Sequence, residues 1–320
     1  MIFAEDVHVH FRTRFLRRKV RALNGLTLEV RDGDFFALVG QNGAGKSTAM
    51  YCFLGLLRPT SGKVEIMGQV PELGCGLYKD IAYLPEEPHY HLYLTVEEAT
   101  RYYSSLSGKR VSDKAINESL ERLGLAQFKT LPLAKCSKGM KQKVGIAQCL
   151  IHEPKVLFLD EPTRGLDPLI VREFRETLRE IHQRGATIVM NSHVLSEIEM
   201  LANRVAIIEG GKVVVQDDLQ NLLTLNQELY RVIFDGNGNG AVPEYLTAVE
   251  RTGHLVRAFL PKARLSEFME VVRTSGLLLH ECSLKKTSLE ESFFNIIKGE
   301  AMITENANGR SGISSGVGVS

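Results

Sequence analysis

The stretch FFALVGQNGAGKST, residues 35–48, decides how the rest of this chain folds. Its apolar residues 36–39 predict a short buried strand, and the residues from Gly40 to Ser47 match the pattern G-x-x-x-x-G-K-[ST] at every fixed position. Glycine permits backbone conformations and close approaches that a Cβ would block. Successive N–H groups can then surround phosphate oxygens at the N-terminus of a helix, whose dipole favours negative charge. The stretch therefore predicts a phosphate-binding loop between a strand and a helix.

The chemistry of the loop points to a nucleoside triphosphate. Lys46 is placed to reach the β- and γ-phosphates, and the Ser47 hydroxyl can ligate Mg²⁺. A glycine-rich turn that matches the pattern by chance is the alternative, and a strand before the loop with a helix over residues 48–57 after it would exclude that alternative. The residues that we expect to contact the nucleotide here are Gly40, Gln41, Asn42, Gly43, Ala44, Gly45, Lys46, Ser47 and Thr48.

A second apolar strand, residues 156–159, ends in the two carboxylates Asp160 and Glu161. In P-loop nucleotide hydrolases the acid at the end of such a strand holds Mg²⁺, directly or through water. Glu161 would lie beside it, facing the γ-phosphate, and can polarise an attacking water as a general base. The next buried strand, ATIVMNSH, ends at His193. These residues therefore predict that the phosphate site also hydrolyses the nucleotide that it binds.

Composition excludes several other classes of protein. Lysine and arginine number 39 against 38 aspartates and glutamates, so no overall charge indicates nucleic acid or lipid as a partner. No apolar run approaches the roughly 18–20 residues that cross a bilayer, and the first ten residues lack the layout of a signal peptide. The five cysteines are scattered without C-x-x-C spacing, so we expect neither a disulfide framework nor zinc, and a reduced compartment.

The remaining patterns place the motifs on strands and helices. Alternating apolar residues predict strands over 5–10 and 20–30, with a basic run between them that is most simply a solvated hairpin tip. Binding of this run to phospholipid headgroups or nucleic acid is the alternative. A helical segment is expected from about 95 to 153, a helix over 169–183, and a hairpin that turns at Gly210-Gly211.

Taken together, the motifs resemble those of the ATP-binding subunit of an ABC transporter, over roughly residues 3–224. They occur in the order and at the spacing of that family, whereas the guanine-binding motif of GTPases and the kinase signatures are absent. The motifs are the Walker A GQNGAGKS (40–47), the signature segment CSKGM (136–140), the Walker B VLFLD (156–160) followed by Glu161, the D-loop GLD (165–167) and the switch histidine His193.

The resemblance implies an α/β fold, the P-loop NTPase ABC-cassette fold, with a RecA-like core, an antiparallel β subdomain and a helical subdomain at about 95–153. It also implies ATP and Mg²⁺ as ligands. An aromatic residue near the N-terminus usually stacks on adenine in this family; Phe11 aligns best, with Phe15 as the alternative and a core role for either one as a third. The implied site residues are Lys46, Glu161 and His193 for catalysis, Ser47, Asp160 and Glu86 for Mg²⁺, and Phe11, Glu86, Ser137, Gly139 and Asp167 for further nucleotide contacts.

Two motifs depart from the usual family pattern. Glu86 stands where the Q-loop glutamine is expected, and the signature lacks its leucine, one glycine and its terminal glutamine. Both changes look like the exporter branch, whose motifs read Y-L-P-E and S-K-G-M. We therefore interpret them as marks of a subtype with intact activity.

Ser137 is a good N-cap for the helix that follows it, so the free N–H groups of that helix would point outward. In the family these groups face the γ-phosphate bound to the other subunit's P-loop, which implies a head-to-tail homodimer with ATP at the interface. An ordinary helix cap is the alternative for Ser137, and a small core residue is favoured for Cys136.

The leading hypothesis for function is an ATPase that powers a membrane exporter, through a separate transmembrane permease subunit. This places the chain in the cytoplasm, at the inner face of the cell membrane, with no nucleic acid as partner. The alternative is a soluble ABC-type ATPase that acts on the ribosome or on DNA. Such proteins carry two cassettes or a long coiled-coil insertion, and this chain shows neither. An inactive ATP-binding regulator is disfavoured because Lys46, Asp160, Glu161 and His193 occur together.

From about residue 225 the sequence changes character and predicts a small α/β domain over 225–300 without a cluster of acids, bases or metal ligands. Its expected elements include a helix that begins at Pro243 (PEYLTAVERTG) and a last helix with the capping box Ser288-x-x-Glu291. This domain has two alternative interpretations: it regulates the protein or supports a dimer, or it is a purely structural extension. Residues 301–320 are rich in glycine, serine and asparagine and predict disorder.

Overall fold

The structure is a computed structural model, and it describes residues 1–12, 19–72, 75–224, 229–236, 242–284, 288–298, 302–306 and 310–314. The chain divides into two compact units, Met1–Leu219 and Gln220–Ser320. This boundary falls five residues before the one at 224 that composition predicts. The reason is that helix α7 (Leu219–Thr224) bonds to the second unit, since the Oγ of Ser292 donates to the Leu222 carbonyl at 2.7 Å.

The first unit is built around a six-stranded sheet in the order β5-β6-β7-β3-β8-β9. Neighbouring strands run parallel except for β9, which pairs antiparallel with β8. Every residue of β3, β6 and β7 is buried, as expected of parallel strands covered on both faces. The strands are β3 (Phe35–Val39), β5 (Ile81–Leu84), β6 (Val156–Asp160), β7 (Thr187–Asn191), β8 (Arg204–Glu209) and β9 (Lys212–Asp218).

The predicted helices and hairpin next to this sheet are confirmed with small shifts. Helix α1 (Lys46–Phe53) follows the glycine-rich loop but ends four residues before the expected Leu57, because Gly55 turns the chain with a φ of 64°. Helix α5 (Pro168–Gln183) buries the predicted apolar stripe, and helix α6 (Leu195–Leu201) follows β7. The turn between β8 and β9 uses two left-handed glycines, 210 and 211.

A second, antiparallel sheet in the order β2-β1-β4 packs on α1. It consists of β1 (Ile2–Arg12), β2 (Lys19–Val30) and β4 (Ser61–Ile66). Leu26, Leu28 and Ile66 share a core cluster with Met50 and Phe53 of α1. The centre of the basic run, including residues 13–18, lies outside the described residues, so the prediction of a hairpin tip there is not tested.

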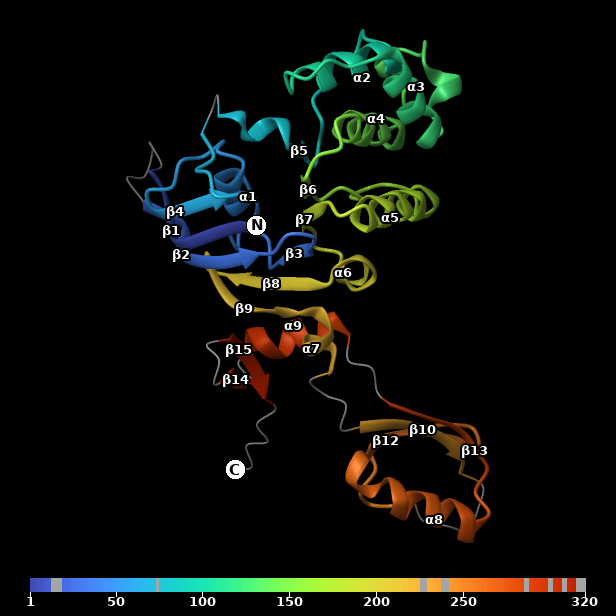
Figure 1. Cartoon of the computed structure of the whole chain (residues 1–320). Helices are drawn as coiled ribbons and strands as arrows, with labels where there is room; N and C mark the ends of the chain where they lie inside the picture. The colour runs from blue at the N-terminus through green and yellow to red at the C-terminus, as the bar shows by residue number, and fades with distance from the viewer. Residues whose placement is uncertain are drawn as a thin grey trace. The chain divides into compact units, whose positions relative to one another are not determined.

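The predicted helical segment forms three helices that group together beyond the β5 edge of the sheet (Figure 1). Each begins at a hydroxyl side chain that accepts from a backbone N–H in the first turn, and the cap at Thr95 includes a full capping box with Glu98. The helices are α2 (Val96–Ser105), α3 (Asp113–Arg122) and α4 (Lys138–Leu150), which begin at Thr95, Ser112 and Ser137 respectively.

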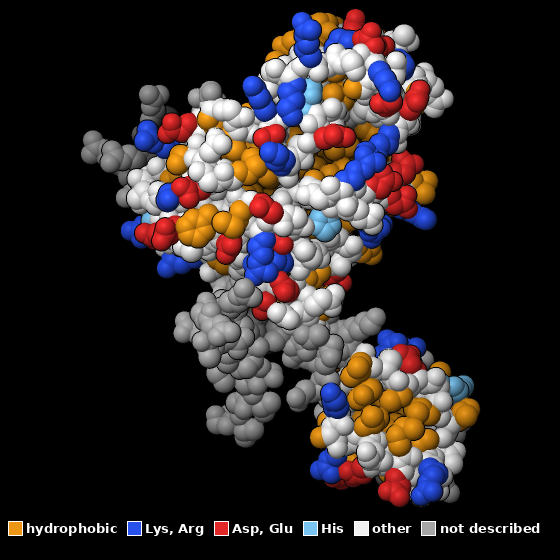
Figure 2. Space-filling model, in the orientation of Figure 1, with side chains coloured by type: hydrophobic (Ala, Val, Ile, Leu, Met, Phe, Trp, Pro, Cys, Tyr) orange, Lys and Arg blue, Asp and Glu red, His pale blue; other side chains and the backbone are white. Residues whose placement is uncertain are grey.

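The second unit contains a four-stranded antiparallel sheet in the order β11-β12-β10-β13, with helix α8 (Leu265–Ser275) on one face. Phe268 of α8 is fully buried and meets Phe234 edge-on, with ring centroids 5.6 Å apart. Apolar side chains gather on the visible surface of this unit (Figure 2). The strands are β10 (Leu229–Asp235), β11 (Thr247–Thr252), β12 (Leu255–Pro261) and β13 (Leu279–Leu284).

The predicted helix from Pro243 is wrong. The chain turns at residues 244–245 and then forms β11, which pairs with β12 across a left-handed Gly253. Thr247, Val249 and Thr252 are β-branched and favour an extended backbone. Pairing with β12, which is continuous from Glu250 to Thr252 after an irregularity that follows Thr247, overrides the weaker signal of a proline at a helix start.

The end of the second unit holds helix α9 (Leu289–Lys298) and a hairpin of β14 (Met302–Asn306) and β15 (Arg310–Ser314). The predicted cap is present, because the Glu291 N–H donates to the Ser288 Oγ at 3.1 Å. A lone two-stranded hairpin is marginally stable in water, so disorder over 301–320 stays a prediction. No helix within the described ranges combines the length and hydropathy that crossing a membrane requires.

Candidate functional site

The loop between β3 and α1 owes its shape to glycines. Gly43 and Gly45 have φ angles of 84° and 109°, in the left-handed region that favours glycine. A Cβ on Gly45 would lie 2.6 Å from the carbonyl oxygen of Ala22, and one on Gly40 would lie 2.4 Å from that of Ile208. The loop is therefore pressed between neighbouring strands, with a strand before it and a helix after it, which excludes a chance match to the motif.

Lys46 is the buried cation of this loop. Its Nζ donates to the carbonyl oxygens of Gly40 at 2.7 Å and Gln41 at 3.0 Å. Burial lowers the pKa of Lys46, while the nearby carboxylates of Glu161 and Asp160 raise it. The loop carbonyls hold this ammonium group near two acids, and a cation at the start of the helix after the loop is arranged to bind an anionic phosphate chain.

The end of β7 supplies a site residue that the sequence analysis missed. Strand β7 lies between β3 and β6, and Asn191 stands in register with Asp160. The Nδ2 of Asn191 donates to Asp160 Oδ1 at 2.6 Å and to Ser47 Oγ at 3.3 Å. One amide thus links the phosphate-binding helix to the strand-end acid. The available signal was a polar residue closing the apolar run TIVM, at the level where Asp160 closes its own strand.

Ser47 and Asp160 fit Mg²⁺ by their chemistry, since the ion prefers hydroxyl and carboxylate oxygens. Burial raises the pKa of Asp160, and the Glu161 and Glu86 carboxylates add to this, against the Asn191 hydrogen bond and Lys46. A cation bound beside Asp160 would stabilise the charged carboxylate and offset the free-energy cost of burying it. The Asn191 Oδ1 is also buried without a partner. No group of three or more His, Cys, Asp or Glu within the described ranges could hold a metal ion, so the fit rests on this mixed pair.

Glu161 and His193 form the second part of the site. The Nδ1 of His193 lies 2.5 Å from Glu161 Oε2, and the His193 backbone N–H donates to the same oxygen at 3.3 Å. Glu161 is buried at 9% exposure, whereas the His193 side chain is half exposed. The histidine therefore orients a carboxylate that faces the hollow beside Lys46.

These side chains line one hollow of about 420 Å³ at the carboxyl ends of the parallel strands. Asn42, Gly43 and residues 45–48 of the loop form one wall, with Glu161 and His193 at the other. Phe11, from β1, also lines it and is 43% exposed, so its ring is available to a flat ligand. Gly40, Gln41, Ala44 and Asp160 belong to the same elements without lining this hollow.

Glu86 lies at the edge of the same hollow, in the segment after β5. Its Oε1 accepts from Nη1 of Arg164, which follows the Walker B strand and also lines the hollow. Arg164 is a second residue that the sequence analysis missed, because no motif marks it.

Ser137, Gly139 and Asp167 do not line this hollow. Ser137 caps α4, accepting from the Met140 N–H at 3.2 Å, as predicted. Gly139 packs against α5, since a Cβ there would lie 2.4 Å from Ile170 Cδ1. Asp167 is the N-cap of α5, and its side chain makes no capping hydrogen bond.

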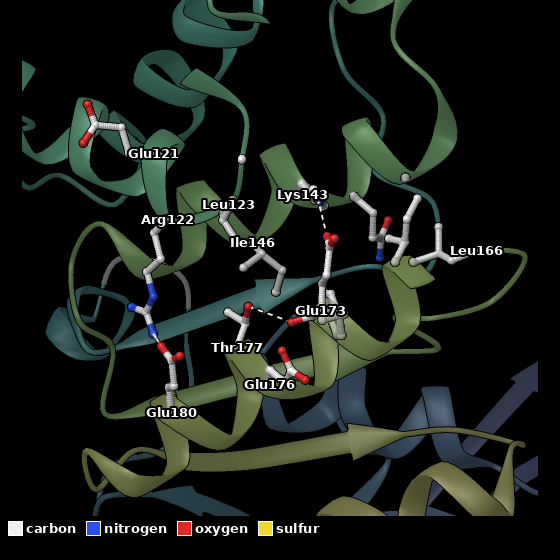
Figure 3. A pocket seen from close by; sticks show the side chains of 15 residues that line it. Glu121, Arg122, Leu123, Lys143, Ile146, Leu166, Glu173, Glu176, Thr177 and Glu180 are labelled. Carbon is white, nitrogen blue, oxygen red and sulfur yellow. Dashed lines mark hydrogen bonds and ion pairs between the residues drawn. The ribbon is translucent and has the colours of Figure 1, made fainter. Parts of the chain in front are cut away.

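Gly139 instead lines a groove of about 470 Å³ between α3, α4 and α5 (Figure 3). Two ion pairs reach across it, from Lys143 to Glu173 and from Arg122 to Glu180, each at 2.6 Å. None of the predicted catalytic residues lines this groove. It lies between the helical segment and α5 and is separate from the hollow that Lys46 lines.

A phosphate-binding loop, a magnesium-compatible acid on a nearby strand and an oriented carboxylate define the class of P-loop nucleotide hydrolases. A family model described as "ABC transporter" matches residues 23–164. An uncharacterized ABC transporter ATP-binding protein of Synechocystis is 33% identical over 300 residues, covering 92% of this chain and 84% of that protein. The bacitracin transport ATP-binding protein BcrA of Bacillus licheniformis is 30% identical, covering 87% of this chain and 93% of that protein.

Solved structures agree on the fold. The ATP-binding subunit of an ABC transporter matches with a TM-score of 0.60 and 30% identity, covering 69% of this chain and 91% of that one. A dimeric ATP-binding cassette in a post-hydrolysis state, bound to ADP and Pi, matches with a TM-score of 0.63 at 22% identity, covering 68% and 99%. The chain belongs to the ATP-binding subunits of ABC transporters, and it has the ABC-cassette fold of these ATPases.

Proposed function

We propose that the hollow binds Mg·ATP and hydrolyses it with the residues that line and support it. Lys46 and the loop N–H groups would bind the β- and γ-phosphates. Ser47 and Asp160 would hold Mg²⁺, which neutralises charge on the phosphates, and Glu86 is a further candidate at the rim. Phe11 would stack on the adenine ring from the open side of the hollow.

Glu161 would act as the general base, taking a proton from the water that attacks the γ-phosphate. The observation that carries this proposal is the bond between Glu161 Oε2 and His193 Nδ1, at 2.5 Å, in the same hollow as Lys46. The bond fixes the carboxylate beside the phosphate-binding loop. Through Glu161 and the attacking water, His193 would respond to the presence of the γ-phosphate.

A second copy of this chain would complete the site. Ser137, Gly139 and Asp167 lie outside the hollow of their own chain, yet the N-terminus of α4 offers free N–H groups suited to a phosphate. This supports a head-to-tail homodimer in which ATP lies between the Walker A loop of one copy and the signature segment of the other.

We further propose that the cycle powers export by a separate transmembrane permease, with this chain at the cytoplasmic face of the membrane. The support is similarity to bacitracin transport and lantibiotic transport ATP-binding proteins, together with the Y-L-P-E and S-K-G-M motif variants. The direction of transport rests on these variants. The relatives named here are described as transport ATP-binding proteins, and none of these names favours the alternative of a ribosome- or DNA-acting ATPase.

Phosphate release by the purified full chain with Mg·ATP tests the site. Lys46→Ala should lower turnover about 10²- to 10³-fold, because a desolvated cation aimed at the phosphate is lost. Lys114→Ala is the matched control, since Lys114 is 84% exposed on α3 and does not line the hollow. Normal turnover in Lys46→Ala would overturn the assignment of the phosphate-binding loop.

A further inference from the structure

Glu86 and Arg164 form an ion pair that joins two strand ends at the rim of the nucleotide hollow. They are 78 residues apart in sequence, but Glu86 follows β5 and Arg164 follows β6, which are parallel neighbours in the sheet. Both side chains line the hollow, and the Arg164 Nη1 donates to the Glu86 Oε1.

The ion pair between Glu86 and Arg164 affects the charge of a hollow that also contains other carboxylates. Glu86 and Glu161 line the hollow and Asp160 lies beside it, whereas the cations that line it are the buried Lys46, the exposed Arg21 and Arg164 itself. Without a partner, Glu86 would add repulsion to an anionic phosphate chain.

We propose that Arg164 is a positioning residue whose guanidinium neutralises Glu86 and thereby allows a glutamate at the rim of an anion-binding site. It acts on the ligand through Glu86, and the inference rests on the proposed binding of Mg·ATP in this hollow. The side chains of Arg164 and Glu86 are 58% and 34% exposed. Exposed ion pairs add little to stability, so the effect should appear in ligand binding.

The test is a double-mutant cycle on the full chain, with calorimetric titration of Mg·ATP and Mg·ADP. Arg164→Ala should weaken Mg·ATP binding about tenfold and change Mg·ADP binding less than about twofold, because the unpaired Glu86 repels the terminal phosphate. Glu86→Gln is the background against which the loss of Arg164 is compared. The double variant should bind Mg·ATP within about twofold of Glu86→Gln, because the charge that required neutralisation is gone.

Two further variants exclude a general effect of losing an arginine. Arg164→Lys should keep most of the affinity, because it keeps the charge. Arg172→Ala should bind as the wild type does, because Arg172 pairs with Glu176 on the surface of α5 and does not line the hollow. The weakening in Arg164→Ala should also shrink at high salt, as screening weakens the repulsion.

Unchanged Mg·ATP affinity in Arg164→Ala would overturn the inference. So would a double variant that binds Mg·ATP about tenfold more weakly than Glu86→Gln, because that result would make Arg164 a phosphate ligand in its own right. Failure of the proposed function looks different: the wild type would then bind no Mg·ATP, or Lys46→Ala would bind it as tightly as the wild type.

Discussion

Glu161 has a left-handed backbone, with a φ of 46°. For a residue with a Cβ this conformation costs roughly 1–2 kcal/mol, and it persists only where the surroundings enforce it. Here the Glu161 N–H donates to the Asn191 carbonyl at 2.8 Å, and its carboxylate is held by His193. The conformation orients the carboxylate before any ligand binds, which suits a general base.

The two adjacent acids should respond differently to loss of charge. Glu161→Gln keeps shape and hydrogen-bonding reach but loses basicity, so Mg·ATP should still bind while hydrolysis falls about 10²-fold or more. Asp160→Asn alters the proposed magnesium ligand and should weaken Mg·ATP binding itself. Phosphate release and calorimetric titration on both variants separate the two roles. Rapid hydrolysis by Glu161→Gln would show that another group is the base.

At the scale of elements, the N-terminus of α4 is suited to bind a phosphate but does not line the hollow of its own chain. Three helices of the helical segment begin with the same type of hydroxyl cap, at Thr95, Ser112 and Ser137. The residue after Ser137 is Lys138, and α4 has no acid in its first turn, in contrast to α2 and α3. A helix start without acids, next to a lysine, favours an approaching phosphate.

Ser137→Arg tests whether this helix start meets a partner's nucleotide. A bulky side chain there should leave Mg·ATP binding by the single chain intact and prevent ATP-driven association. Size-exclusion chromatography with Mg·ATP measures the association, and Ser112→Arg is the matched control, because it alters the same type of cap on α3. An ATP-dependent dimer of Ser137→Arg would contradict the proposed interface.

The elements that the sequence could predict are those set by local pattern. Residues 36–39, 156–159 and 188–190 are apolar runs that predict buried strands, and the loop after the first of them matches a known sequence motif. The strand β11 was missed because its formation depends on pairing with β12, which no local pattern reveals.

Site residues were missed for a related reason. Asn191 acts because β7 lies between β3 and β6 in the sheet, an order that the sequence does not display. Arg164 acts because β5 and β6 are neighbours, which brings it to a glutamate far away in the chain. Contacts between strand ends follow from topology, and topology follows from packing of the whole first unit.

At the scale of the whole molecule, one chain holds the proposed nucleotide site and, apart from it, the signature segment. Lys46, Glu161 and His193 line the hollow, and Ser137 and Gly139 do not. Two copies arranged head to tail would complete two sites at once. ATP then stabilises the dimer because it binds residues of both copies, and hydrolysis would release them.

Light scattering of the Glu161→Gln chain with and without Mg·ATP tests this account most directly. Because binding survives and hydrolysis is blocked, the variant should form a stable species with twice the mass of one chain when Mg·ATP is added, and a monomer without it. A variant that stays monomeric at saturating Mg·ATP would contradict the account of ATP binding between two copies.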